Sequence, residues 1–172
     1  MKTAIITDSS AYLSEEIREK ANVFVLDVPV FIAGETYIEG KNLTVQAFYD
    51  KMAATDDLPK TSQPSISDLV TLLEKLQADG YTHVIGLFLI QYLKDEFPDL
   101  TLFFPDTLIT SAPLGYMVEM AYNMTKTNAP FDFITSELTE IINQTTAFII
   151  VDDLDHLVKG GRLSNGAAMI GN

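Results

Sequence analysis

Cysteine and tryptophan are absent from this sequence of 172 residues, and histidine occurs only twice. Without cysteine the chain can form neither a disulfide nor a thiolate metal site, and this fits a reducing compartment. His83 and His156 are too few for a histidine-based metal site, and no group of acidic residues has EF-hand or zincin spacing. The sequence therefore predicts neither a metal nor a cofactor.

Basic residues are also scarce, with 11 Lys and Arg against 24 Asp and Glu, for a formal net charge of -13. Nucleic acids and anionic lipid surfaces need clustered Lys and Arg, so neither is an expected partner. No apolar run is long enough to cross a bilayer, and the first residues turn polar too early for a signal peptide. We therefore expect a cytoplasmic protein without stable membrane insertion.

Several common motifs are missing too. The sequence contains no P-loop, no G-x-G-x-x-G and no G-x-S-x-G. These absences remove the usual sequence signals of nucleotide binding and of serine hydrolases.

What is present is an apolar chain in which strand-like and helix-like segments alternate. Hydrophobic residues make up 47% of the sequence, enough to fill one substantial core. The alternation is typical of an α/β fold with a mostly parallel sheet and flanking helices. Expected strands cover residues 3–6, 23–32, 35–38, 82–89, 101–104 and 146–151, with a hairpin turn at 33–34. Expected helices cover residues 14–21, 44–52, 90–97, 113–126 and 154–158, one that starts at the capping-box sequence SISD (65–68) and stops at Gly80, and one from 135 or 136 to 143.

Polar residues gather in three clusters beside expected strand ends and helix starts: residues 7–10, residues 61–63, and residues 105–107 with 110–111. In parallel α/β sheets, ligands collect at the carboxyl ends of the strands, next to helix N-termini. Hydroxyl groups dominate these clusters, and Asp8 and Asp106 are their only carboxylates. That composition suits holding a carboxylate or a phosphate better than moving protons.

Each candidate also has a purely structural interpretation. Residues 61–65 can be a turn with a helix cap, and Asp8 with Ser9 can be an ordinary turn between strand and helix. His83 lies within an expected apolar strand, which favours a buried histidine over a catalytic base. His156 has acidic neighbours in the sequence, which favours a solvated surface position. The sequence by itself leaves these alternatives open.

The segment KGGR forms the one local basic spot of the chain. Gly160 and Gly161 can simply end a helix, and the flanking Lys159 and Arg162 can in addition provide a docking or anion-binding site. The sequence pattern favours neither interpretation.

Five segments taken together resemble the DegV family of bacterial fatty-acid-binding proteins: ITDSSAYL, VPVFIAGETYIEG, KTSQPSISDL, THVIGLFL and DDLDHLVKGGRLSNGAAMIG. The resemblance runs from residue 1 to the last residue, and the combination of TSQPS with LVKGGR makes it specific. It implies two α/β domains with a long-chain fatty acid between them. Residues 1–145 then form the N-terminal domain, and residues 146–172 begin a second domain that is truncated here.

The resemblance also implies a function without catalysis. Family members look like acyl carriers, which present a fatty-acid carboxylate to a separate ATP-dependent fatty acid kinase and hold the resulting acyl phosphate. By this similarity Thr61 and Ser62 bind the carboxylate, Asp8 and Ser9 line the mouth of the site, and the segment from Lys159 to Arg162 contacts the kinase or the phosphate.

Two departures from the family pattern matter. Family members carry a Ser- and Gly-rich loop directly after the strand that corresponds to residues 82–89, and one of its serines is a carboxylate ligand. This sequence has no such loop there. Family chains also continue well beyond the equivalent of Asn172, so half of the expected ligand cavity is absent if this chain is the whole molecule.

Two other classes of function stay open. A fold similar to a domain of dihydroxyacetone kinases makes a phosphoryl-transfer or hydrolytic enzyme conceivable, with Asp8 and Asp106 as its carboxylates. The family's association with control of degradative enzymes makes a regulatory interaction protein the third hypothesis.

Overall fold

The structure is a computed structural model that describes residues 1–39, 41–88, 96–148, 150 and 154–161. The chain forms two compact units. The first consists of Met1–Val28 with Gln63–Thr146, and the second of Pro29–Ser62 with Ala147–Asn172. Among the described helices, none is long and apolar enough to cross a membrane.

A parallel sheet is the centre of the first unit. Its strands are β1 (Thr3–Asp8), β2 (Val23–Leu26), β6 (His83–Leu87) and β7 (Thr101–Phe103), in the spatial order β2-β1-β6-β7. All neighbouring strands pair in parallel, with Ile5 opposite Val23 and Ile85. The α/β fold with a parallel sheet and flanking helices is therefore confirmed.

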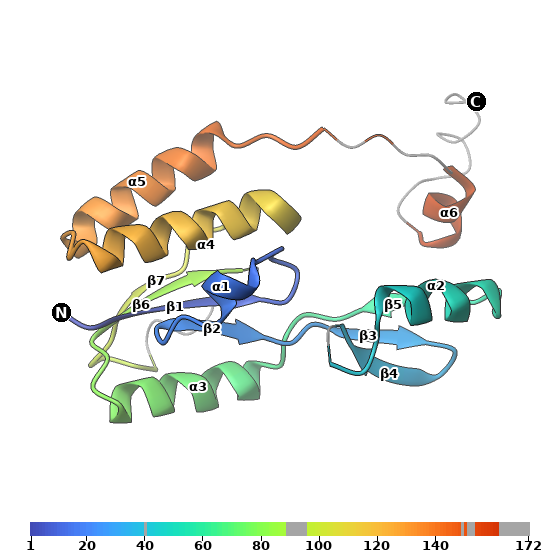
Figure 1. Cartoon of the computed structure of the whole chain (residues 1–172), viewed down its shortest axis with the longest axis horizontal. Coiled ribbons are helices and arrows are strands. Elements are labelled where there is room, and N and C mark those ends of the chain that lie inside the picture. The colour runs from blue at the N-terminus through green and yellow to red at the C-terminus, as the bar shows by residue number, and fades with distance from the viewer. Residues whose placement is uncertain (40, 89–95, 149, 151–153, 162–172) are drawn as a thin grey trace. The chain divides into compact units, whose positions relative to one another are not determined.

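Helices cover both faces of this sheet (Figure 1). α3 (Ile66–Ala78) lies on one face, and α4 (Ser111–Lys126) and α5 (Phe131–Gln144) lie on the other, where the short α1 (Glu15–Arg18) also packs. The side chains of β1 alternate between the two faces, as a strand buried on both sides requires.

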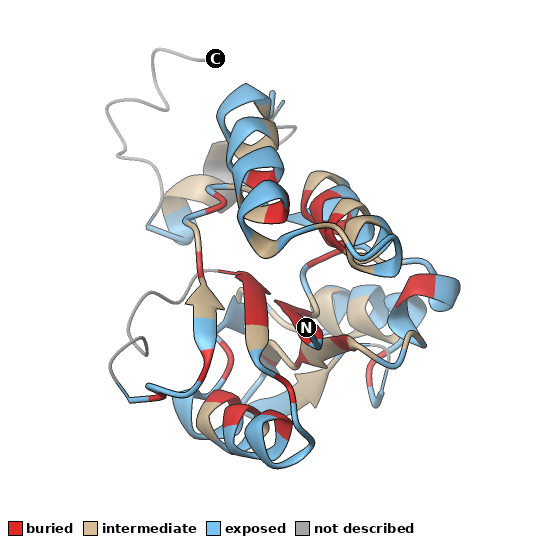
Figure 2. Ribbon diagram, turned by 90° about the vertical axis from the view of Figure 1, so that its left-hand side faces the viewer, coloured by how far each residue is buried: buried red, intermediate tan, exposed pale blue. Residues whose placement is uncertain are grey.

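Two apolar clusters result from this alternation, and both are fully buried at their centres (Figure 2). On the α3 face, Ala4, Ile6 and Val84 pack against Leu69, Leu73 and Leu76. On the other face, Ile5, Ile85 and Leu87 pack against Leu114, Met117, Val118, Ile134 and Leu138.

The expected stop of α3 is confirmed, but its expected capping box is not formed. The backbone of Gly80 has φ +78°, a conformation that ends helices and suits glycine. Ser65 is the N-cap residue, yet its side chain makes no capping hydrogen bond. Its hydroxyl instead pairs with that of Ser67, at 2.6 Å between the two oxygens.

The single strand predicted over residues 23–32 is wrong, because the structure divides it between two sheets. β2 ends at Leu26, and β3 (Pro29–Ile32) belongs to the second unit. The amide of Val28 donates to Ser9 Oγ and is therefore turned away from a strand ladder. Pro29 has no amide to donate, so it is tolerated as the first residue of β3.

The second unit contains an antiparallel sheet in the order β4-β3-β5, with β4 (Glu35–Ile38) and β5 (Lys60–Thr61) on either side of β3. The predicted hairpin is confirmed, and its turn residues Ala33 and Gly34 both have positive φ. This unit also holds α2 (Val45–Ala53) and α6 (Leu154–Lys159). Thr44 caps α2, since its Oγ1 accepts a hydrogen bond from the amide of Ala47 at 3.1 Å.

The helical spacing of Phe48 and Tyr49 favours a core position for both aromatic side chains, and this is wrong for Tyr49. Val45 and Tyr49 are 65% and 63% exposed. Phe48 is half-buried against a small cluster of Val30, Ile32 and Leu43. Among the described residues of the second unit, this small cluster is the apolar surface against which α2 packs.

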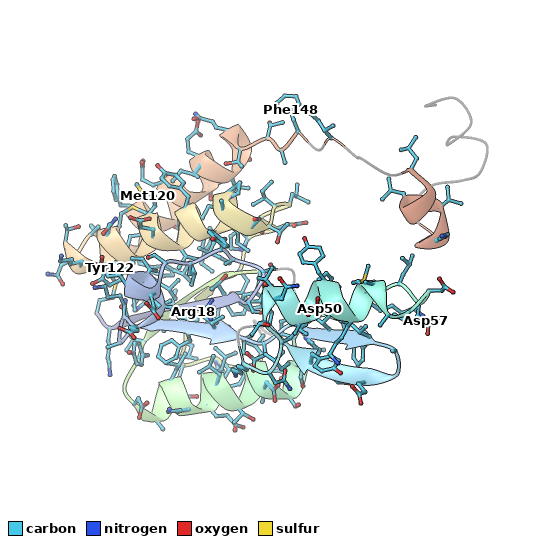
Figure 3. All side chains as sticks on the ribbon, turned by 45° about the vertical axis from the view of Figure 1, so that its right-hand side comes forward. Arg18, Asp50, Asp57, Met120, Tyr122 and Phe148 are labelled. Atoms are coloured by element: carbon cyan, nitrogen blue, oxygen red, sulfur yellow. The ribbon has the colours of Figure 1, made fainter. Side chains whose placement is uncertain are left out.

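Two further element predictions are corrected. The helix expected to start at residue 135 or 136 begins at Phe131, directly after Pro130, and Thr135 lies inside it with its hydroxyl donating to the carbonyl of Asp132. In the expected strand over residues 146–151, the described residues form no strand, and Phe148 (labelled in Figure 3) is 93% exposed. The helix expected over residues 90–97 lies largely outside the described residues.

Candidate functional site

The strand order β2-β1-β6-β7 creates a topological switch point between β1 and β6. From β1 the chain first adds β2 on one side and later β6 on the other. In open parallel sheets, ligands bind in the crevice outside the carboxyl ends of the two strands at such a point. A side-chain hydrogen bond joins the ends of β1 and β6, because the buried Thr7 donates from Oγ1 to the carbonyl of Leu87 at 2.9 Å.

The turn after β1 is built on Asp8, whose side chain is only 6% exposed. Its Oδ1 accepts hydrogen bonds from the amide and the hydroxyl of Ser10, the amide at 2.9 Å. The Oγ of Ser9 accepts from the amide of Val28 at 2.9 Å, which ties the turn to the segment after β2. Asp8 therefore shapes the turn, while the hydroxyl hydrogen of Ser9 can still be donated.

The structure brings a second predicted cluster against this turn. The amide of Ser111 donates to the carbonyl of Ser10 at 2.9 Å, and Thr110 Oγ1 donates to the same oxygen at 3.4 Å. The amide of Tyr12 in turn donates to the carbonyl of Ser111. The loop after β1 and the start of α4 thus form one hydroxyl-rich surface at the carboxyl edge of the sheet.

Gly115 makes this close approach possible, and it was missed in the sequence. A Cβ atom on Gly115 would lie 2.6 Å from the carbonyl oxygen of Tyr12. The only signal in the sequence was an isolated glycine inside a helical pattern, which costs about 1 kcal/mol relative to alanine and so calls for a packing reason.

Asp106 and Thr107 serve the turn that leads from β7 towards α4. Asp106 Oδ1 accepts from the amide of Leu108 at 3.2 Å, and the buried Thr107 donates to the carbonyl of Ile109 at 3.4 Å. Both hydrogen bonds stay within the turn, so both side chains stabilise the turn itself.

The N-termini of α3 and α4 lie at the same edge of the sheet as the carboxyl end of β1 (Figure 1). Neither N-cap residue, Ser65 or Thr110, makes a side-chain capping hydrogen bond. The first amides of a helix, together with its dipole, favour an anion at this position. This edge can therefore hold a negatively charged group.

Thr61 and Ser62 belong to the second unit. Thr61 is the last residue of β5, opposite Val30, with an exposed side chain, and the amide of Ser62 donates to the carbonyl of Pro29 at 3.4 Å. The residue that caps α3 is Ser65, so the cap interpretation does not extend to these two hydroxyl groups.

Of the two residues predicted to contact the kinase or the phosphate, only Lys159 lies within the described residues. Lys159 is the exposed last residue of α6, and in the second unit it lines a cavity of about 460 Å³ with Lys60, Asp56 and Asp57. Arg162 and most of the segment after β6, where the Ser- and Gly-rich loop was expected, lie outside the described residues.

His83 stands at the start of β6, the end of the sheet opposite the candidate site. Burial lowers its pKa, the N-terminal charge acts in the same direction, and Asp132 opposes both. Its ring packs 4.7 Å from that of Phe131, and its Nδ1 lies 2.8 Å from Thr82 Oγ1. The described part of the chain contains no group of three potential metal ligands. At the carboxyl edge of the sheet, the hydroxyl of Ser9 and the start of α4 remain as hydrogen-bond donors for an anion.

Comparison with known proteins gives the family. The model of a family described as "Uncharacterised protein, DegV family" matches residues 2–172. A DegV domain-containing protein from Streptococcus pneumoniae is 56% identical over 182 aligned positions, which cover 100% of this chain and 64% of that protein. The chain thus spans less than two thirds of the length of this relative.

Solved structures agree in fold. The crystal structure of a fatty acid binding DegV family protein from Streptococcus agalactiae matches with a TM-score of 0.91 at 52% identity, covering 100% of this chain and 64% of that one. The structure of DegV, a fatty acid binding protein from Bacillus subtilis, matches with a TM-score of 0.80 at 32% identity and the same coverage. With its family model, its sequence relatives and its fold in agreement, this chain belongs to the DegV family.

Proposed function

We propose that the protein binds a long-chain fatty acid and holds its carboxylate at the hydroxyl-rich edge of the parallel sheet. The observation that carries this proposal is the match, at 52% identity and a TM-score of 0.91, to a protein described as fatty acid binding. The hydroxyl of Ser9, which accepts from Val28 and can still donate its proton, and the uncapped start of α4 support it, because a carboxylate needs several hydrogen-bond donors.

Thr61 and Ser62 are the proposed carboxylate ligands of the second unit, and Asp8 and Ser9 line the mouth of the site. Both Asp8 and Asp106 accept hydrogen bonds from turn amides, which favours a carrier over an enzyme. We assign the phosphorylation step to a separate fatty acid kinase, with Lys159 and Arg162 as its contact or as phosphate ligands. A cytoplasmic location, an N-terminal domain over residues 1–145 and a second domain starting at residue 146 complete the proposal.

Native mass spectrometry of the protein mixed with oleate tests the binding. We expect a mass excess of one oleate, which the double variant Thr61→Ala/Ser62→Ala loses. The matched control is Thr36→Ala/Ser136→Ala, which removes one exposed hydroxyl of each kind from β4 and α5. Removing a hydrogen bond to a charged group costs about 1.5–3 kcal/mol, so the loss of two ligands weakens binding at least about a hundredfold.

Circular dichroism separates a lost ligand site from a lost fold. Thr61 is exposed at a strand end, so the double variant keeps its spectrum and its melting temperature to within a few degrees. Equal oleate binding by the double variant and the control would remove Thr61 and Ser62 from the site. Absence of an oleate complex in the unmodified protein would overturn the carrier function itself.

A further inference from the structure

The chain passes from one compact unit to the other after Val28, after Ser62 and after Thr146. The first of these crossings follows strand β2 directly, since β2 ends at Leu26 and β3 begins at Pro29. Hinges in proteins are short connections of this kind, in which a few residues absorb the change in backbone angles. The contacts of the first crossing therefore decide how freely its backbone can move.

Ser9 holds the first crossing to the parallel sheet. Its amide donates to the carbonyl of Leu26 at 2.8 Å, and its Oγ accepts from the amide of Val28 at 2.9 Å. These two hydrogen bonds lie on either side of Asp27 in the sequence. One residue of the turn after β1 thus fixes the backbone up to Val28, where the chain leaves the first unit.

The backbone on the other side of Val28 is already stiff. Pro29 has a φ of about −65° and no amide, and the residue before a proline is held in an extended conformation. The amide of Ser62, at the second crossing, donates to the carbonyl of Pro29 at 3.4 Å. The hydrogen bond from Val28 to Ser9 is therefore the contact through which a change at Ser9 can reach the crossing.

The hydroxyl of Ser9 is accessible to a ligand, because the residue is only half-buried. Its oxygen accepts from Val28, so its hydrogen remains for donation to another group. The proposed function places the fatty-acid carboxylate beside this hydroxyl. A hydroxyl that donates to an anion becomes a stronger acceptor, because hydrogen bonds in a chain polarise one another. A carboxylate bound at Ser9 therefore strengthens the hydrogen bond from Val28.

We infer that Ser9 couples occupancy of the carboxylate site to the first crossing, so that the loaded protein holds Val28 and Pro29 more tightly than the empty one. The inference rests on the proposed function and adds a conformational consequence to it. Ser9 acts as a positioning residue for the crossing, through the oxygen that accepts from Val28. The connection between the two units is stiffer when the fatty acid is bound.

Amide hydrogen exchange followed by NMR, with and without oleate, tests the inference. Native mass spectrometry of the same samples measures the bound oleate. We expect exchange at Val28 to slow about two- to tenfold on loading, because each bond in such a chain strengthens its neighbour by roughly 10–30%.

Reference amides separate this local effect from a general one. A bound ligand stabilises the whole fold and slows exchange wherever it depends on global unfolding. The amides of Gly80 and Ala129 serve as the reference, since they close the turns after α3 and α4 at 3.0 and 3.1 Å, away from the carboxyl edge of the sheet. We expect the slowing at Val28 to exceed theirs.

Three variants show whether the response depends on Ser9. Ser9→Ala removes the acceptor, so Val28 exchanges about two- to tenfold faster in the empty protein, and the slowing by oleate is lost at equal occupancy. Ser9→Thr retains a hydroxyl and restores both properties. Ser136→Ala is the control, because it removes an exposed hydroxyl from α5 and leaves exchange at Val28 unchanged.

Two results would overturn the inference. One is bound oleate with no more slowing at Val28 than at Gly80 and Ala129, which leaves the carrier function standing without the coupling. The other is unchanged exchange at Val28 in the empty Ser9→Ala protein, which means that Ser9 does not hold the crossing. Absence of bound oleate from the mass spectrum overturns the carrier function itself, and the coupling with it.

Discussion

Replacing Gly115 by alanine tests how closely α4 packs against the loop after β1. A Cβ atom at this position would lie 2.6 Å from the carbonyl oxygen and 3.2 Å from the carbonyl carbon of Tyr12, while ordinary contacts begin at 3.4 Å. Both atoms are backbone, so rotating a side chain cannot relieve the clash. Either α4 or the loop must move.

Two opposing terms set the size of the effect. Alanine in a helix interior is favoured over glycine by about 1 kcal/mol. Overpacking a buried contact costs about 1–3 kcal/mol, and the rigid carbonyl places this case at or beyond the upper end. We therefore expect a net loss of about 1–2 kcal/mol in the free energy of unfolding, or a melting temperature lower by about 2–8 °C for a chain of this length.

Urea unfolding followed by far-UV circular dichroism measures this loss, with Asn123→Ala as the control on the same helix. Asn123 is exposed, so its replacement raises stability by a few tenths of a kcal/mol through helix propensity alone. NMR shifts of the Tyr12 and Ser111 amides report movement of the loop. A rise in stability for Gly115→Ala similar to that of the control would refute the close-packing argument.

Three further predictions concern the sheet. Thr7→Val removes the hydroxyl that donates to the carbonyl of Leu87, and we expect a loss of about 1–2 kcal/mol in urea unfolding. Leu73→Ala empties a fully buried position of the α3 face and costs about 2–5 kcal/mol in the same assay, whereas a loss below 1 kcal/mol would contradict the packing. Burial lowers the pKa of His83, so the unfolded chain takes up this proton at higher pH than the folded one. The contribution of His83 to stability is therefore complete above its ordinary pKa of about 6.5 and declines as the pH falls below it. His83→Gln should flatten that decline, and an NMR titration that gives His83 a pKa above 6.5 would contradict the reasoning.

Local sequence predicted most elements of the first unit because their side-chain pattern already matches their final environment. The apolar run around Val84 and Ile85 becomes the central strand β6, buried on both faces. The amphipathic pattern before Gly80 becomes α3, and the glycine takes the positive φ that ends it.

The predictions failed where an apolar pattern had more than one possible partner. The run VFVLDVPVFI is almost continuous in hydrophobicity, yet it leaves one sheet after Leu26 and enters another at Pro29, with the amide of Val28 between them donating to Ser9. Tyr49 has the spacing of a core residue on α2, yet α2 packs against the small cluster of Val30, Ile32 and Leu43 and leaves Tyr49 exposed.

For the candidate site, the sequence supplied the polar residues but not their roles. Asp8, Ser9 and Asp106 all lie in the polar clusters that composition marked as candidates, and the resemblance to the family placed Asp8 and Ser9 at the mouth of the site. The structure places both carboxylates in turns and puts the loop after β1 against the start of α4, a contact between positions about 100 residues apart. No local pattern encodes that contact, because it depends on the order of the strands and on the missing side chain of Gly115.

The sequence by itself determined the fold class, the family and the expected chemistry, since these depend on hydrophobic period, motif residues and composition. The tertiary structure decided which hydroxyl groups meet at the sheet edge and which side chains stay exposed on α2. Within the described residues, it also left the buried hydroxyl of Thr3 without a hydrogen-bond partner. These properties arise from strand order and close packing between distant segments, so they exist only once the chain has folded.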